Sequence, residues 1–249
     1  MWSWADNLAG HASIYVVEQG RENRDWERWG YHRPEPLDLS ERGQQVLGVD
    51  RQCSRSILGV VPAFAAGVRQ ALHDGADTIA CLHDDLEIEQ QGWDAEVRQL
   101  FKLFPPAGLC GFGGAKGLGS DDIYQAPYDP MQLVRQNFRS NMRHAEVHGI
   151  RSQAIEPVAC LDGFSQIGRR EFWLGQPGPN SPKDAGGYLI KGHPANLFEV
   201  MASKGIIHHA YDSALGAFAR LLGYKVWYLP VAVHHFGGVT AVGDPRYHQ

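Results

Sequence analysis

An apolar run that ends abruptly in acidic residues is the feature that most constrains this chain. Residues 78–82, Thr-Ile-Ala-Cys-Leu, are too few for a helix and predict a buried strand. His83, Asp84 and Asp85 follow at once, and Glu87 adds a third carboxylate. Ligands of open α/β sheets bind beyond the carboxyl ends of strands. Two interpretations follow from these residues alone: a solvated acidic turn, or a site whose oxygen ligands hold Mg²⁺ or Mn²⁺ on a diphosphate.

Composition narrows the class of protein. The 249 residues are 43% hydrophobic and 20% charged, which suits one large α/β domain or two small ones. The formal charge of -5, without a dense Lys/Arg cluster, argues against a nucleic-acid partner. The four cysteines form no C-x-x-C pair, which argues against a structural zinc site and favours a reducing compartment. With no apolar run long enough to span a bilayer and no secretory leader, we expect a cytoplasmic protein without a transmembrane segment.

The first half of the chain alternates between strand and helix patterns. Residues 12–17 and 46–49 are rich in β-formers and predict strands. Residues 61–72 repeat apolar side chains at three- and four-residue steps and predict a helix that Gly75 ends. Because the strand 78–82 follows, this order predicts a parallel crossover unit.

Further elements follow the same patterns. Helices are expected at 93–104, 131–145, 169–173, 197–203 and 211–222, and strands at 107–113, 155–161 and 225–233. Pro230 interrupts the last strand and predicts an edge or bulged position. The glycine-rich run 111–119 fits neither the dinucleotide-binding nor the P-loop spacing, and we interpret it as a flexible loop at a strand end.

Four landmarks stand in a characteristic order: residues 59–67 at the start of a helix, His83-Asp84-Asp85, residues 160–164 before Arg169-Arg170, and Tyr211-Asp212 before Gly223-Tyr224, Leu229-Pro230 and His234. Together they resemble a nucleotide-sugar glycosyltransferase of the GT-A fold, family 2 type, closest to its streptomycin-biosynthesis-like branch. The resemblance covers residues 12–240. It departs from the family pattern where the usual first strand is lacking and where Ala65 replaces the common Asn.

This resemblance implies the fold and its divisions. The fold class is α/β, with a GT-A (Rossmann-like), mostly parallel central sheet flanked by helices and a mixed acceptor-side half. We expect one domain over 1–249. Its nucleotide- and metal-binding half would be 1–115, a helical insertion or connector 116–157, and the acceptor-binding half 158–249.

The resemblance also assigns donor-binding and metal-binding roles. His83-Asp84-Asp85 occupies the family's DXD motif, so Asp85 matches the acid that holds Mn²⁺ or Mg²⁺ on the donor diphosphate. His83 and Asp84 match the donor-contacting positions of that motif. Glu18, at the end of the strand 12–17, falls near the expected nucleotide base and ribose. Asp162 either contacts the substrates or anchors its turn with Gly163.

Three residues of the second half complete the implied site. Asp212, at a helix start, matches the family's base, although an aspartate there also serves as a helix cap. A His after the last strand can complete the metal shell, and His234 and His235 both fit. Because neighbouring residues of a strand point to opposite faces, at most one of the two is expected to face the site.

The sequence therefore predicts an inverting, metal-dependent glycosyltransferase that moves a sugar from a nucleotide-diphosphate sugar to a saccharide or other hydroxyl acceptor. One alternative is a catalytically incomplete, transferase-like domain that only binds nucleotide. The other alternative is a metal-dependent hydrolase, which should gather at least three side chains of its His/Asp set around an ion. That set comprises His83, Asp84, Asp85, His208, His209, His234 and His235.

Overall fold

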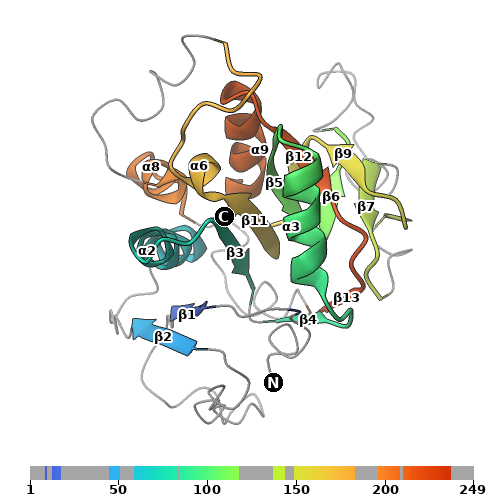
Figure 1. Ribbon diagram of the computed structural model, residues 1–249, viewed down its shortest axis with the longest axis horizontal. Coiled ribbons are helices and arrows are strands. Elements are labelled where there is room, and N and C mark those ends of the chain that lie inside the picture. Colours follow the sequence, from blue (N-terminus) through green and yellow to red (C-terminus); the bar gives the residue numbers. More distant parts are fainter. Residues whose placement is uncertain are drawn as a thin grey trace. The chain divides into compact units, whose positions relative to one another are not determined.

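A computed structural model describes most of the chain, and its helices and strands are labelled in Figure 1. The chain divides into two compact units. The described residues are 9, 13–17, 45–50, 59–83, 85–117, 137–143, 149–182, 196–207 and 210–236. Unit 1 takes its described residues from 10–79 and 168–224, and unit 2 from 2–9, 80–167 and 225–249. The prediction of one domain in three stretches is not tested by this division.

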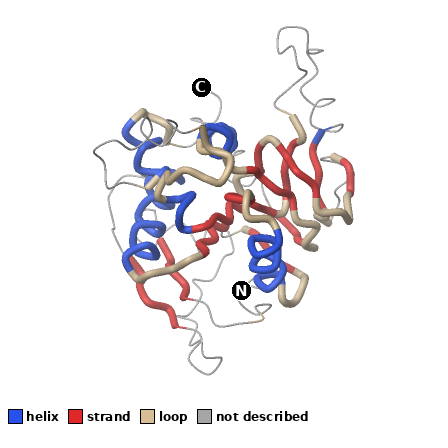
Figure 2. The backbone as a smooth tube through the Cα atoms, turned by 45° about the horizontal axis from the view of Figure 1, so that its top comes forward, coloured by secondary structure: helices blue, strands red, loops and turns tan. Residues whose placement is uncertain are grey.

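Unit 1 is built around packed helices. Helix α2 (Val60–His73) lies beside α8 (Leu197–Ser203), as Figure 1 shows, and α8 contacts α9 (Tyr211–Leu221). Figure 2 shows the helices in blue and the strands in red. The short helix α6 (Arg170–Trp173) belongs to the same unit. Strands β1 (Ser13–Val17) and β2 (Gln45–Asp50) pair in parallel. Aromatic rings connect the helices, since Phe198 contacts Phe64 and Trp173 at centroid distances of 5.3 and 5.0 Å.

The C-terminal end of α2 is held by a glycine and an arginine. Gly75 has a φ of 86°, and Ala76 donates its backbone N–H to the Ala71 carbonyl at 3.0 Å, which closes the helix in a Schellman-type turn. The Arg170 guanidinium donates through Nη1 to the carbonyls of Leu72 and Ala76 at 2.9 and 3.2 Å. A cation is favourable there because the last carbonyls of a helix carry partial negative charge.

The largest sheet has five strands in the order β3-β11-β5-β12-β9. These strands are β3 (Thr78–Leu82), β11 (Ser165–Arg169), β5 (Ala107–Gly111), β12 (Lys225–Tyr228) and β9 (Glu156–Val158). Strand β12 runs parallel to β5 and antiparallel to β9. Backbone bonds join His83 to Phe164 at one end of the β3–β11 pair and Arg170 to Asp77 at the other, so these two strands are antiparallel.

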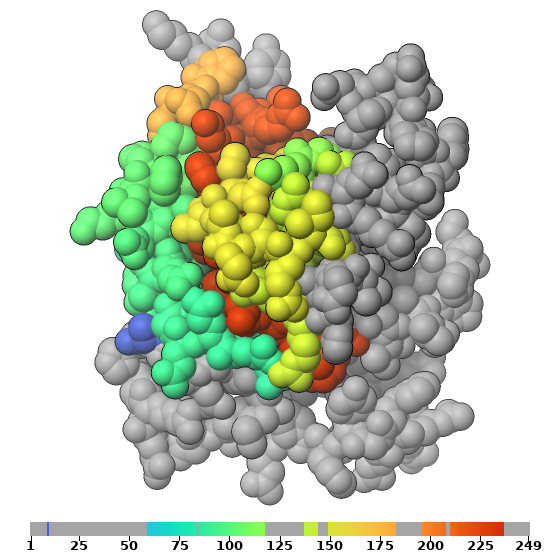
Figure 3. Space-filling model, turned by 90° about the vertical axis from the view of Figure 1, so that its right-hand side faces the viewer, coloured from blue at the N-terminus to red at the C-terminus, as the bar shows by residue number. Residues whose placement is uncertain are grey.

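Unit 2 also contains two smaller sheets and one long helix. Strands β10 (Cys160–Leu161), β6 (Gly113–Ala115), β7 (Phe138–Ser140) and β8 (Ile150–Arg151) form one sheet in that order. Figure 3 shows residues 137–143 in yellow-green beside the yellow segment that begins at 149. Strands β4 (Leu86–Ile88) and β13 (Val233–His235) form an antiparallel pair. Helix α3 (Trp93–Leu103) packs on β5.

The α/β class predicted from the sequence is confirmed, and the helices α2, α3, α6, α8 and α9 lie where they were predicted. A mostly parallel sheet is not what the described strands form. Antiparallel pairs join β12 to β9, β10 to β6, β6 to β7 and β13 to β4, whereas the parallel pairs are β1–β2, β12–β5 and β7–β8.

Two local predictions were wrong, and a third was confirmed in part. The helix predicted over 131–145 is a strand where it is described, because Phe138 and Ser140 point inward while Arg139 between them is half-buried, the two-residue period of a strand. The strand over 225–233 is interrupted at Pro230, as predicted; of the two predicted positions, β12 is not at an edge, since it has partners on both sides, but its pairing with β5 has a register shift between Lys225 and Val226. In the glycine-rich run, residues 113–115 form the strand β6. Glycine suits this region because a Cβ at Gly111 would overlap the Ser165 carbonyl oxygen.

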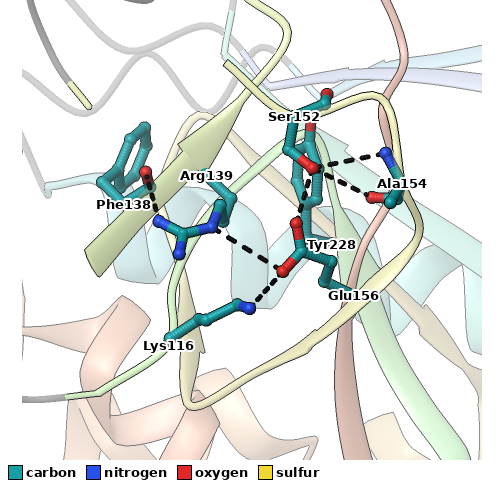
Figure 4. A network of polar contacts seen from close by, with 7 residues as sticks. All are labelled: Lys116, Phe138, Arg139, Ser152, Ala154, Glu156 and Tyr228. Atoms are coloured by element: carbon teal, nitrogen blue, oxygen red, sulfur yellow. Dashed lines mark hydrogen bonds and ion pairs between the residues drawn. The ribbon is translucent and has the colours of Figure 1, made fainter. Parts of the chain in front are cut away.

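A polar network fastens the strands of unit 2 to one another (Figure 4). The Glu156 carboxylate of β9 forms ion pairs with Lys116, which follows β6, and with Arg139 of β7. Ser152 donates its hydroxyl to Glu156 at 2.5 Å, and Tyr228 of β12 donates its hydroxyl to the Ser152 carbonyl at 2.8 Å. The network therefore links side chains from two sheets through one carboxylate.

The Glu156 network predicts a pH-dependent contribution to stability. Lys116, Ser152 and Arg139 hold the pKa of the Glu156 carboxyl below its ordinary value. A carboxyl whose pKa is lowered in the folded state stabilises the fold above its unfolded pKa of about 4.3, and that stabilisation is lost as the pH falls through the folded pKa. We expect the gap in unfolding free energy between wild type and Glu156→Gln to shrink from pH 6 to pH 3, measured by urea denaturation. A gap that stays constant over this range would contradict the assignment.

The Arg170 contacts predict a second effect on stability. Arg170→Ala removes two charge-assisted hydrogen bonds to backbone carbonyls and should lower the unfolding free energy by about 1.5–3 kcal/mol. Arg170→Lys keeps the charge but has no planar fork, so it should fall between wild type and Arg170→Ala. Guanidinium denaturation of the three proteins measures the difference, and equal midpoints for all three would rule out this role.

Candidate metal centre

Three side chains of unit 2 converge at one point. His83 follows β3, Asp85 precedes β4, and His235 ends β13. The distance from Asp85 Oδ1 to His235 Nε2 is 3.2 Å, and to His83 Nδ1 it is 3.8 Å. One ligand atom from each residue lies within 4.8 Å of the other two, an arrangement that could hold a metal ion.

Two strand pairings create this convergence. In the β4–β13 pair, His235 lies opposite Leu86, and the Phe236 backbone N–H donates to the Asp85 carbonyl at 2.9 Å. His235 therefore lies next to Asp85 although the two are far apart in the sequence. His83 is fixed from the other side, since its backbone N–H donates to the Phe164 carbonyl at 3.0 Å.

The chemistry of the three side chains suits a cation. Asp85 Oδ1 and His235 Nε2 are buried and lie 3.2 Å apart, and neither atom has a geometrically well-formed hydrogen bond within the described part of the chain. A buried polar atom without a partner costs about 1–3 kcal/mol, and an ion accepting both lone pairs would remove that cost. Metal–ligand distances of about 2.0–2.2 Å separate neighbouring ligand atoms by roughly 3 Å, so small side-chain movements suffice to close the group around an ion.

Electrostatics keeps the carboxylate of this group ionised. Burial acts to raise the pKa of Asp85, but the contact with His235 and the charges of His235 and His83 outweigh it, and the pKa lies below its ordinary value. Burial acts to lower the pKa of His235, whereas Asp85 and Asp162 raise it above the ordinary value. Burial raises the pKa of the nearby Cys81 thiol.

The two predicted metal-binding histidines take different positions. His234 lies opposite Glu87 in the β4–β13 pair, with its Nδ1 3.7 Å from Glu87 Oε2 and its ring 4.0 Å from that of Phe236. Of the two, His235 contributes to the group with Asp85. The structure thus places neighbouring residues of β13 with different partners, as the alternation along a strand predicts.

Asp162 lies in the turn that faces His235. Its backbone N–H donates to the Gly113 carbonyl at 2.9 Å, and its Oδ1 accepts the backbone N–H of Phe164 at 3.4 Å. These contacts anchor the turn, and the carboxylate also raises the pKa of His235. Phe164 is fully buried, and its ring lies 4.7 Å from the His235 ring.

Asp212, which is described, does not belong to this group. Asp212 lies in the first turn of α9 in unit 1, where Ala210 is the N-cap residue and Asp212 Oδ1 accepts the backbone N–H of Ser213 at 2.7 Å. Glu18 and Asp84 lie outside the described residues, and so do His208 and His209.

Sequence reasoning missed the residues that support the three ligands. Phe164 lies in the Asp162-Gly163-Phe164 turn. Its contacts with His83 and His235 join segments that are distant in the sequence, so no local pattern predicts them. The strand β11 itself was not predicted, so Gln166 was not considered. A strand pattern across residues 165–169, with Gln166 as its buried polar member, is the signal that could have found it.

No protein-family model matches this chain, and no curated protein matches it significantly. Among the described residues, no helix is both long enough and apolar enough to cross a bilayer.

The geometry predicts unequal effects of the two neighbouring histidines. His235→Asn removes a ligand and should weaken Mn²⁺ or Zn²⁺ binding at least about tenfold, because loss of even an indirect supporting partner costs 10–100-fold. His234→Asn, the matched control on the same strand, should bind with nearly wild-type affinity. Titration calorimetry of the two variants measures their affinity for the metal ion. A larger loss of affinity in His234→Asn than in His235→Asn would contradict the assignment of His235 as the ligand.

Proposed function

We propose that the protein is a metal-dependent glycosyltransferase that moves a sugar from a nucleotide-diphosphate sugar to an acceptor hydroxyl. The observation that carries this proposal is the convergence of His83, Asp85 and His235 beyond the carboxyl end of β3. A strand that ends in His-Asp-Asp is the position at which the resemblance predicts the donor diphosphate. A carboxylate with a lowered pKa is already ionised there and available to a cation.

The set of ligand atoms favours one of the two expected metals. Two imidazole nitrogens and one carboxylate oxygen suit Mn²⁺ better than Mg²⁺, which prefers oxygen ligands and retained waters. A bound divalent ion supplies Lewis-acid stabilisation of the diphosphate leaving group. The protein's part is to hold three ligand atoms close together and to keep them beside a buried aromatic ring, Phe164.

Asp212 is the proposed base for the acceptor hydroxyl. It stands in the first turn of α9, and a carboxylate is one of the groups that can accept the proton of a reacting hydroxyl. A single base with direct attack gives inversion at the anomeric carbon. Glu18, Asp84 and Asp162 are the proposed contacts to the donor. A GT-A fold, membership of family 2 and a cytoplasmic location belong to the same proposal.

Donor binding tests the transferase. We expect Mn²⁺-dependent binding of at least one member of a panel of UDP-, GDP- and dTDP-sugars, measured by calorimetry. Asp85→Asn should abolish the Mn²⁺-dependent part of donor binding. Glu87 is a neighbouring carboxylate on β4, and Glu87→Gln should bind the donor as wild type does. Asp212→Asn should retain donor binding and lose sugar transfer. If no donor binds with Mn²⁺ present, the transferase proposal fails.

One observation favours a second candidate, a metal-dependent hydrolase. Three side chains of its predicted set, His83, Asp85 and His235, gather at one point. Two histidines and one carboxylate also match the protein ligands of hydrolytic zinc sites, which keep a position open for water. Zn²⁺-dependent cleavage of chromogenic phosphate and carboxylate esters, lost in Asp85→Asn, with no binding of nucleotide sugars, would select the hydrolase.

A further inference from the structure

Gln166 is a buried polar residue whose hydrogen bonds are only half satisfied. It lies in β11 and is completely buried. Its Nε2 donates to the backbone carbonyl of Asp162 at 2.9 Å. Its Oε1 is buried and has no hydrogen-bond partner among the residues that the structure describes. The amide orientation is fixed by the contact with Asp162, because exchanging the two atoms would bring two acceptors together.

The contact of Gln166 closes the turn formed by residues 162–165. The Asp162 carbonyl accepts from two donors, the backbone N–H of Ser165 at 3.4 Å and the Gln166 amide. The backbone N–H of Asp162 is bound to the Gly113 carbonyl in turn. The turn is thus tied to β6 on one side and to the Gln166 side chain on the other.

This turn contacts both histidines of the candidate metal centre. Phe164, in the middle of the turn, accepts the backbone N–H of His83 through its carbonyl at 3.0 Å. Its ring lies against the His235 imidazole at 4.7 Å, with 32° between the planes. A displacement of Phe164 would therefore move both imidazoles relative to Asp85.

We infer that Gln166 is a positioning residue of the metal centre. Its amide N–H holds the turn, and through Phe164 the turn sets the separation and orientation of His83 and His235. An apolar side chain of the same length would fill the site without an unpartnered acceptor, so the glutamine is unfavourable for folding alone. A buried polar group that lacks a hydrogen-bond partner is expected mainly at sites where function requires it. The inference rests on the proposed metal centre.

The test replaces the amide by an apolar chain of similar length. In Gln166→Met, we expect the Kd for Mn²⁺ to rise about tenfold or more, as for other supporting partners of metal ligands, with an unchanged or higher Tm. The visible absorption of bound Co²⁺ should shift, because it reports ligand geometry. The matched control is Ser140→Ala, which removes another completely buried polar atom without a partner in the same unit. It should change neither the Kd for Mn²⁺ nor the Co²⁺ spectrum.

The possible results separate this inference from the proposed function. A wild-type protein that binds neither Mn²⁺ nor Co²⁺ would overturn the metal centre itself. Metal binding by wild type, with an equal Kd and the same Co²⁺ spectrum in Gln166→Met, would overturn the positioning role alone. Should Gln166→Met be unfolded by circular dichroism, Gln166→Leu repeats the test. Unfolding of both variants would also overturn the inference, since it would assign Gln166 to the stability of the fold.

Discussion

The antiparallel pairing of β3 with β11 is the constraint on which the candidate site depends. It sets the end of a buried strand beside a turn, so that the backbone of His83 is bound to Phe164. Without this pair, His83 and Asp85 would be the acidic end of an isolated strand. With it, Phe164 packs its ring on His235, and a third ligand from the last described strand joins the first two.

The energetic character of the site follows from these placements. Asp85 Oδ1 and His235 Nε2 are close together and buried, and neither forms a hydrogen bond within the described residues. The Oε1 atom of Gln166, in β11, is also buried without a hydrogen-bond partner there. Buried polar atoms without partners are uncommon in folded proteins, and each one raises the free energy of the fold. A bound cation would use the first two atoms, while Gln166 supports the turn that positions the histidines. The free-energy cost of these buried polar atoms is therefore consistent with a site that binds a cation. The surrounding aromatic and aliphatic core supplies the stability that offsets this cost.

The sequence predicted the elements that depend on local pattern. Helix α2 has its apolar face and Gly75, and α9 has its own apolar face and Gly223, so both were placed to within about two residues. The helix predicted over 131–145 failed because apolar residues four apart, such as Phe138 and Met142, are also compatible with a strand followed by a turn. In the structure both are buried, but Arg139, which follows Phe138 in β7, pairs with Glu156, a contact between segments that are distant in the sequence.

The same distinction applies to the site. His83, Asp85 and His235 were predicted as site residues from a strand end and from a strand's final residues. Their meeting depends on the β4–β13 register, which aligns His235 with Leu86 and His234 with Glu87. A shift of one residue would exchange the two histidines, because the side-chain period of a strand is two. Such a register is decided by packing between distant segments, and no local pattern in the sequence contains it.

The central claim is that one divalent ion is bound by two imidazoles and one carboxylate, and pulsed electron paramagnetic resonance of bound Mn²⁺ tests it most directly. With ¹⁵N-labelled histidine, the spectrum of the wild-type protein should show hyperfine coupling to two directly bound imidazole nitrogens. Bound Mn²⁺ without any coupling to histidine nitrogen would contradict the account.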